Sequence, residues 1–216
     1  MSLSTPEATS EVPETRETLT QSPRHHLSIK SLIAIGIFSA VYFVILGATS
    51  MMGMISPVFH LLGISASTLI NAFVIMALQA RSPHFGTMTI LGTLVSGVIV
   101  LMGQFWGAVF FGAGFGLLAD LVNLAGRHRS RIAAIWSYGV LQLWLIGPLM
   151  PVFLTPDAFF SRIVKRRGEA YVEVMQALFT PSTLVIFHVV NALFGVLMAF
   201  LATRALKRYF EKTSVL

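Results

Sequence analysis

Apolar residues are gathered into six long stretches, separated by short polar segments. The hydrocarbon core of a bilayer is about 30 Å thick, so a helix needs about 20 mostly apolar residues to cross it. The predicted spans are Ser31–Met52, Pro57–Ala80, Phe85–Met102, Phe105–Ala125, Ile132–Val152 and Pro181–Ala205. Only Gly103 and Gln104 separate the third span from the fourth, which predicts a tight hairpin. The pattern as a whole predicts an all-α membrane protein, a bundle of six transmembrane helices.

The long loop between the fifth and sixth spans, residues 153–180, has a pattern of its own. Thr155 and Pro156 are typical of a helix start, and the acidic Asp157 favours the first turn. Apolar residues then recur at helical spacing up to Gly168, and the pattern resumes after it. We expect two short amphipathic helices lying on the outer surface of the bundle. The alternative is a solvated loop without regular structure.

The N-terminal segment differs from the rest of the chain. Residues 1–26 are rich in Ser, Thr, Pro and Glu, a composition typical of disorder. An apolar stretch beginning only near Ser31 is too late for a secretory signal peptide. We therefore expect residues 1–26 to form a disordered cytoplasmic tail and residues 27–216 to form one six-helix domain.

Composition and charge support this interpretation. Of the 216 residues 55% are hydrophobic and only 11% are charged, against roughly 25% charged in a soluble domain. The net charge of +6 could suggest nucleic acid, but the basic residues flank the apolar stretches. In the six-span topology eleven basic residues share one side: Arg16, Arg24, Lys30, Arg81, Arg127, Arg129, Arg131, Arg204, Lys207, Arg208 and Lys212. The other side has four: Arg162, Lys165, Arg166 and Arg167. The positive-inside rule then predicts that both termini are cytoplasmic.

Asp120 is the only acidic residue inside a predicted span. Ionisable groups in a membrane are usually functional, so a proton relay is one interpretation. It would need a second carboxylate or a histidine at the same depth, and none is evident. The favoured interpretation is pairing with Arg127 or Arg129 near the end of the fourth span.

Polar and aromatic residues gather in the outer half of the predicted spans. Counted inward from the outer ends, seven residues share this leaflet: His60, Gln104, Trp106, Gln142, Trp144, His188 and Asn191. Buried polar groups are costly in hydrocarbon, so they should face the bundle interior, where they could line a substrate-binding pocket. The alternative is interhelical hydrogen bonding combined with an aromatic belt at the membrane interface.

Catalytic and metal sites are not predicted. The chain has no cysteine, and its histidines lack the spacing of a metal-binding motif. His60 and His188 could serve only an axially ligated cofactor. No serine lies in a nucleophile motif.

Small residues on the helices suggest close packing. Gly36 and Ala40 lie one turn apart on the first span, and the fourth span carries Gly107, Gly112, Gly114 and Gly116. Such faces allow helix backbones to approach each other. Internal packing is sufficient to explain the fourth span, whereas the first could dock another membrane protein.

Several segments together resemble a known family. They are residues 35–43 (IGIFSAVYF), 85–92 (FGTMTILG), 116–121 (GLLADL), 143–148 (LWLIGP) and 157–160 (DAFF). In this order they are similar to the substrate-binding S components of energy-coupling factor (ECF) transporters, specifically the Trep_Strep (MptD-like) group. The resemblance runs from about Leu27 to the C-terminus.

The resemblance implies a non-catalytic subunit of an ATP-driven importer in the bacterial cytoplasmic membrane. It would capture a vitamin or other micronutrient outside and deliver it inward with a transmembrane T component and two ABC ATPase subunits. In many S components an AxxxA face on the first helix contacts the T component, and Gly36 and Ala40 occupy the matching positions here.

Other interpretations remain open. An intramembrane enzyme could use His60, His188 and Asp157 as acid–base groups, and a purely structural subunit needs no site at all. The neutral and aromatic character of the predicted pocket favours a flat or amphipathic organic ligand over a metal ion. Haem is one such ligand, with His60 or His188 as the axial ligand, transported rather than held as a cofactor.

Overall fold

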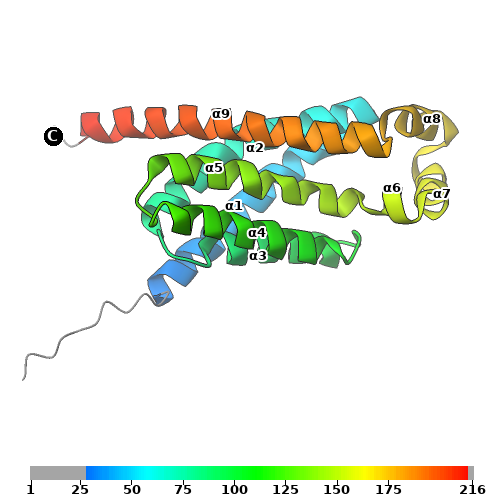
Figure 1. Ribbon diagram of the computed structural model, residues 1–216. Helices are drawn as coiled ribbons and strands as arrows, with labels where there is room; N and C mark the ends of the chain where they lie inside the picture. The colour runs from blue at the N-terminus through cyan, green and yellow to red at the C-terminus, as the bar shows by residue number, and fades with distance from the viewer. Residues whose placement is uncertain (1–27, 214–216) are drawn as a thin grey trace, which may run out of the picture.

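The computed structural model describes residues 28–213, and in that part of the chain every regular element is a helix. Figure 1 shows a bundle of long helices in which the first two cross the others obliquely. These helices are α1 (Ile29–Ser50), α2 (Pro57–Arg81), α3 (Thr87–Leu101), α4 (Ala108–Ala125), α5 (Arg131–Gln142) and α9 (Pro181–Thr213). The predicted disordered tail lies outside the described residues. The all-α membrane bundle that the apolar pattern predicts is confirmed.

Five of the apolar segments are long and apolar enough to cross a membrane. The α5 segment reaches this length only together with η2 (Leu143–Leu149), a 3₁₀ helix that continues it. The remaining apolar helix, α3, is shorter, with 15 residues, or about 22 Å at 1.5 Å per residue. The fifth span was predicted over Ile132–Val152, and the apolar segment found there runs over Arg131–Leu149, with its second part wound as a 3₁₀ helix. Pro148 lies within η2 and lacks the N–H that an α-helical turn requires.

The two ends of the bundle differ in character. Figure 1 shows the start of α1, the end of α9 and the α2–α3 and α4–α5 connections at one end, here called the basic end. Its flanking residues include Arg81, Arg129 and Arg131. The opposite end, here called the capped end, carries the short helices α6 (Pro151–Leu154), α7 (Pro156–Arg167) and α8 (Glu169–Leu178). Both ends of the described chain therefore lie at the same end of the bundle.

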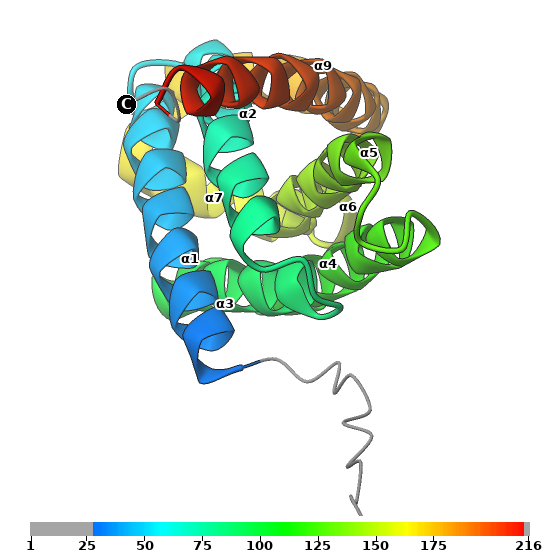
Figure 2. The ribbon, with the colours of Figure 1, turned by 90° about the vertical axis from the view of Figure 1, so that its left-hand side faces the viewer.

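Figure 2, which looks onto the basic end, shows how the crossing helices surround the interior. The helix pairs α1–α2 and α3–α4 pack along their lengths, and α9 packs against both α2 and α5. The interior of this arrangement holds large buried side chains that include Tyr42, Tyr138 and Trp144.

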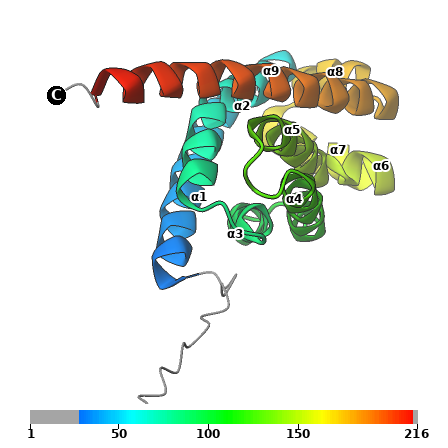
Figure 3. The same ribbon diagram turned by 60° about the vertical axis from the view of Figure 1, so that its left-hand side comes forward.

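The α7 and α8 helices confirm the two amphipathic helices expected in the long loop. Gly168 joins them with a φ of 85°, a conformation that residues with a Cβ rarely adopt. Thr155 is the N-cap residue of α7, but its hydroxyl makes no capping bond. Pro156, the first residue of the helix, was therefore the more informative of the two sequence signals. Figure 3 shows α6, α7 and α8 gathered beside the start of α9.

Two hydrogen bonds fasten α7 and α8 to η1 (Met51–Met54), the short helix that follows α1. The Tyr171 hydroxyl donates to the Gly53 carbonyl at 2.6 Å, and Arg167 Nη1 donates to the Met54 carbonyl at 3.1 Å. Burial raises the pKa of the Tyr171 hydroxyl, with Arg167 opposing the shift. The hydroxyl therefore remains a donor over the physiological range.

Glycines form the contact between α3 and α4. A Cβ at Gly112 would overlap the carbonyl of Gly92 and the side chain of Ser96, and one at Gly116 would lie 2.6 Å from the Met88 carbonyl. Gly114 is different, because it is exposed and a Cβ there meets nothing within 4 Å. Internal packing of the fourth span thus holds for Gly112 and Gly116 but not for Gly114.

Gly112→Ala should destabilise the protein by about 1–3 kcal/mol, because the added methyl group must push two helix backbones apart. The matched variant Gly114→Ala should leave stability unchanged or raise it slightly, since alanine favours helix more than glycine does. Thermal unfolding of both variants in detergent checks this. Equal melting temperatures for the two variants would mean that the backbones of α3 and α4 are not in close contact at Gly112.

Candidate functional site

A set of buried polar side chains lies inside the bundle, here called the polar core. Its members come from α1, α2, α5 with η2, and α9, and each is at most 5% exposed. They are Ser39, Tyr42, Ser67, Thr68, Asn71, Tyr138, Gln142, Trp144, His188 and Asn191. None of them is charged like a carboxylate or an ammonium group. Because hydrocarbon surrounds the bundle, every polar atom here needs a partner inside the protein.

One chain of hydrogen bonds links α1 to α5 and η2. The indole Nε1 of Trp144 donates to the Tyr42 hydroxyl at 3.3 Å, and that hydroxyl donates to Gln142 Oε1 at 3.1 Å. The bonds join residues about a hundred positions apart in sequence. They fix the plane of the Trp144 ring and the orientation of the Gln142 amide.

A second group of bonds links α2 to its neighbours. Asn191 Nδ2 donates to Thr68 Oγ1 at 3.0 Å, and the Tyr138 hydroxyl donates to the Thr68 carbonyl at 2.5 Å. Asn71 Nδ2 donates to Ser67 Oγ at 3.0 Å and to the Tyr42 carbonyl at 3.4 Å. Thr68 is therefore the point at which α2, α5 and α9 meet.

Five buried polar atoms of this core have no partner with hydrogen-bond geometry among the described residues. They are Ser39 Oγ, Asn71 Oδ1, Gln142 Nε2, His188 Nε2 and Asn191 Oδ1. The Tyr138 side chain lies near Gln142, and the Leu145 backbone near His188, but outside that geometry. A buried polar atom left unpaired costs about 1–3 kcal/mol. Each of these five atoms has capacity for one more hydrogen bond, and on this ground the polar core is the candidate site.

His188 presents one defined atom to this core. Its Nδ1 donates to the Leu184 carbonyl at 2.7 Å. The other nitrogen, Nε2, then carries a lone pair in the neutral ring. This nitrogen is buried and has no partner with hydrogen-bond geometry among the described residues, although the Leu145 backbone lies near the ring.

The polar core meets the capped end through Leu184. That residue belongs to a separate apolar cluster with Leu149, Val152, Met175 and Phe179, and side chains of α7 and α8 pack around it. The short helices of the capped end thus cover the part of the core where His188 lies.

The structure brings four of the seven predicted site residues together: Gln142, Trp144, His188 and Asn191. It does not bring Gln104 and Trp106 to them. Trp106 is 67% exposed and lies against Phe105 and Phe110 at the α3–α4 hairpin, the position of an interfacial aromatic residue. The reason is that both hairpin residues are exposed, outside the buried polar core.

His60 takes an intermediate position. It is half-buried at the start of α2, with its ring centroid 6.1 Å from that of Phe179 and its side chain against Gly53. It therefore contacts the covering cluster, and it lies near enough to His188 for an electrostatic interaction between the two rings. Asp157, the third group of the acid–base interpretation, is exposed on α7. The described residues contain no group of three or more His, Cys, Asp or Glu side chains placed to hold a metal ion.

Six members of the polar core were not predicted as site residues from the sequence. Ser39 and Tyr42 are spaced by three residues, as are Thr68 and Asn71, whereas Tyr138 precedes Gln142 by four. Residues three or four apart share one helix face. Polar pairs at this spacing within apolar stretches were the signal that could have identified them.

Asp120 has a different partner from the one expected. It is fully buried, and its carboxylate accepts bonds from Met88 N at 3.1 Å, Thr89 N at 2.8 Å and Thr89 Oγ1 at 2.6 Å. These groups belong to the first turn of α3, whose N-cap residue Gly86 supplies no side-chain bond. The favoured pairing with Arg127 or Arg129 is therefore wrong, and Asp120 instead caps α3 from the neighbouring helix.

The Gly36 and Ala40 face lies on the outside of the bundle. Both residues are exposed, and a Cβ added at Gly36 meets nothing within 4 Å. Of the five long apolar segments, the one containing α1 has the smallest buried share, 22%. No described residue of this chain therefore packs into that face at Gly36.

Comparison with known proteins gives one match. A family model described as a hypothetical bacterial integral membrane protein (Trep_Strep) matches residues 29–212. No curated protein and no solved structure matches the chain.

Proposed function

The chain belongs to the Trep_Strep family of bacterial integral membrane proteins, and from this premise we propose that it is the substrate-capturing S component of an ECF-type importer. The observation that carries the proposal is the polar core with its five unpartnered atoms. A structural subunit gains nothing from unpaired polar atoms in hydrocarbon, whereas a capture subunit needs them to hold its ligand. In this role the protein binds and delivers a molecule without catalysing a reaction.

The chemistry of the core indicates the class of ligand. Its members are amides, hydroxyls, an imidazole and an indole, without an ionised side chain. Such groups suit a neutral or amphipathic organic micronutrient with a flat ring system, which can stack on Trp144. The ligand would enter at the capped end, where the loop helices cover His188 and must move aside.

Haem is the specific ligand that we propose within this class. The unpaired Nε2 of His188 is the atom that an axial ligand to a haem iron offers, while the Leu184 carbonyl holds Nδ1 in place. His60, the other predicted axial ligand, lies against Phe179 at the edge of the core. His188 is therefore the better candidate of the two.

The energising partners would dock on α1. The exposed Gly36 and Ala40 form a shallow strip between larger apolar side chains such as Ile33, Ile37 and Val44, all more than half exposed. Close backbone packing supplies much of the contact between helices in lipid. A helix of the T component can approach here, and two ABC ATPases would complete the importer.

The distribution of charge supports a proposed orientation. The basic end would face the cytoplasm under the positive-inside rule, in the bacterial cytoplasmic membrane. The capped end would then face outward, where a scarce nutrient is captured.

The double variant Gly36→Leu/Ala40→Leu tests the proposal. Because the face is exposed, the variant should fold and retain its co-purified ligand, but it should lose the T component, the ATPases and ATP-driven uptake. Affinity purification from the native host, with mass spectrometry of proteins and small molecules, measures all of these at once. Gly114→Leu is the matched control, since Gly114 is equally open but lies on α4.

Three results would contradict the proposal. The first is that the unmodified protein purifies without ATPases, which favours the enzyme or structural-subunit interpretations. The second is that the double variant keeps its partners and transports normally, which removes the docking role of α1. In the third, the double variant unfolds while Gly114→Leu does not, which would place the α1 face inside the bundle.

A further inference from the structure

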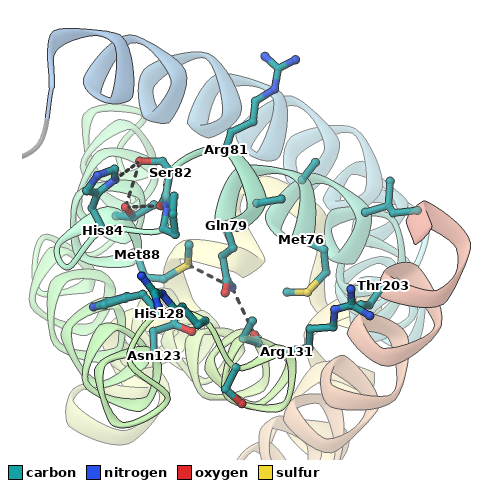
Figure 4. A pocket seen from close by; sticks show the side chains of 18 of the residues that line it. Met76, Gln79, Arg81, Ser82, His84, Met88, Asn123, His128, Arg131 and Thr203 are labelled. Carbon is teal, nitrogen blue, oxygen red and sulfur yellow. Dashed lines mark hydrogen bonds between the residues drawn. The ribbon is translucent and has the colours of Figure 1, made fainter. Parts of the chain in front are cut away.

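A separate cavity of about 850 Å³ opens at the basic end of the bundle. It lies between the end of α2, the start of α3, the α4–α5 turn and the last turns of α9, as Figure 4 shows. Its lining shares no residue with the polar core. The cavity and the proposed substrate site are therefore distinct features, and binding in this cavity would not depend on the proposed transport function.

The charged groups that line this cavity are basic. Four basic residues and two histidines contribute to it: Arg81, Arg129, Arg131, Lys207, His84 and His128. No Asp or Glu is among the described residues that line it. The nearby Asp120 is fully buried, with its carboxylate committed to the first turn of α3. In Figure 4 the Arg81 side chain points away from the opening, so the α4–α5 turn and α9 supply most of the charge.

The deeper wall of the cavity is largely apolar. Met76, Met88 and Leu206 contribute to it, and Gln79 extends across the space in Figure 4. Gln79 Nε2 donates to the Ala134 carbonyl at 3.3 Å and contacts Met88 Sδ at 3.9 Å. The cavity therefore has an apolar interior beneath a basic rim, a combination that fits a molecule with an anionic head and an apolar body.

The α4–α5 turn is held in an unusual backbone conformation. Arg127 and His128 have φ values of 52° and 53°, in the left-handed region that residues other than glycine rarely adopt. The His128 amide donates to the Asn123 carbonyl at 2.9 Å, and Asn123 Nδ2 donates to Ser137 Oγ at 2.9 Å. Such strain persists only where surrounding contacts impose it, and it is concentrated at ligand sites. Here it places His128 and Arg129 at the cavity.

We infer that this cavity binds an amphipathic anion, with a phosphate or carboxylate head at Arg129 and Arg131 and its apolar part against Met76 and Leu206. Charge-assisted bonds from arginine to such a head are among the stronger polar contacts in proteins. The head can belong to an anionic phospholipid of the surrounding leaflet or to a soluble organic phosphate. Both sources present the same chemistry to the cavity.

Decyl phosphate is the soluble probe, and phosphatidylglycerol is the lipid probe. The full chain in phosphatidylcholine nanodiscs should bind decyl phosphate saturably at one molecule per chain, and uncharged decyl maltoside should not compete. Arg129→Gln/Arg131→Gln should weaken this binding by about tenfold, whereas Arg129→Lys/Arg131→Lys should retain most of it. The matched control is Arg204→Gln/Arg208→Gln, which removes the same charge from α9 outside the cavity and should change affinity by less than about twofold.

Native mass spectrometry then identifies the source. Retention of one phosphatidylglycerol that decyl phosphate displaces would assign the cavity to a lipid headgroup. Saturable decyl phosphate binding without lipid retention would assign it to a soluble anion. The inference is overturned if no saturable binding occurs, or if the two glutamine pairs weaken binding equally, since diffuse surface charge would then explain the effect.

Discussion

Replacing Asp120 with alanine should destabilise the protein by about 3–5 kcal/mol and leave little folded material in membranes. The carboxylate accepts three hydrogen bonds from the first turn of α3, and that turn has no capping side chain of its own. Alanine would leave the backbone N–H groups of Met88, which is buried, and Thr89, which is partly buried, without these partners. It would also remove a negative charge from the positive end of a helix dipole.

Two further variants separate the components of this effect. Thr89→Val removes only the hydroxyl bond, so it should cost about 1 kcal/mol. Asp157→Ala removes an acidic residue from the first turn of α7 at an exposed position, and it should change stability by no more than about 0.5 kcal/mol. Thermal unfolding and the yield of monodisperse protein measure all three.

The same experiment tests the proton-relay interpretation of Asp120. If Asp120→Ala folded with an unchanged melting temperature but failed to transport, the residue would act in ion coupling and not in capping. The 31 to 32 positions between Asp120 and its partners explain why the sequence suggested another role. Arg127 is close in sequence, whereas the start of α3 becomes a neighbour only when α3 and α4 pack through their glycines.

The sequence predicts the order and extent of the helices well but not their rotation. The apolar stretches predicted the six apolar segments to within three residues at either end, and Pro156 and Gly168 predicted the starts of α7 and α8. Gln104 and Trp106 were placed in one site with His188 only because all three were predicted in the outer half of the spans. In the structure both hairpin residues are exposed and point away from the interior. The direction in which a side chain points around its helix depends on packing between helices, which hydropathy does not encode.

The polar core likewise contains residues that the sequence alone did not identify. Tyr42 and Tyr138 resemble ordinary aromatic residues of a membrane helix, and their importance comes from hydroxyl bonds to Gln142 and to Thr68 on other helices. The unpaired atoms cannot be deduced from sequence at all, because every amide has a possible partner until the helices are placed.

His188→Leu should abolish most ligand binding while leaving the empty protein as stable as before, or more stable. Leucine is similar in size and removes the unpaired Nε2, whose burial is unfavourable without a ligand. The lost Nδ1 bond is to the carbonyl of the preceding helical turn, so no contact between helices is broken by it. Trp144→Ala is a poorer test, because truncating a fully buried indole costs about 3–5 kcal/mol through the cavity it leaves.

Loss of one buried hydrogen bond or axial ligand should weaken binding by about 10- to 100-fold. Haemin titration followed by absorbance, and mass spectrometry of the molecule that co-purifies, measure this for His188→Leu beside two controls. Trp106→Leu, at the exposed hairpin, should bind normally, and His60→Leu should keep the axial signal if His188 supplies it. Opposite signs in stability and binding identify a ligand site, because a residue that only packs would lower both together. A His188→Leu protein that melts earlier yet retains its ligand would show that the imidazole supports the fold and nothing more.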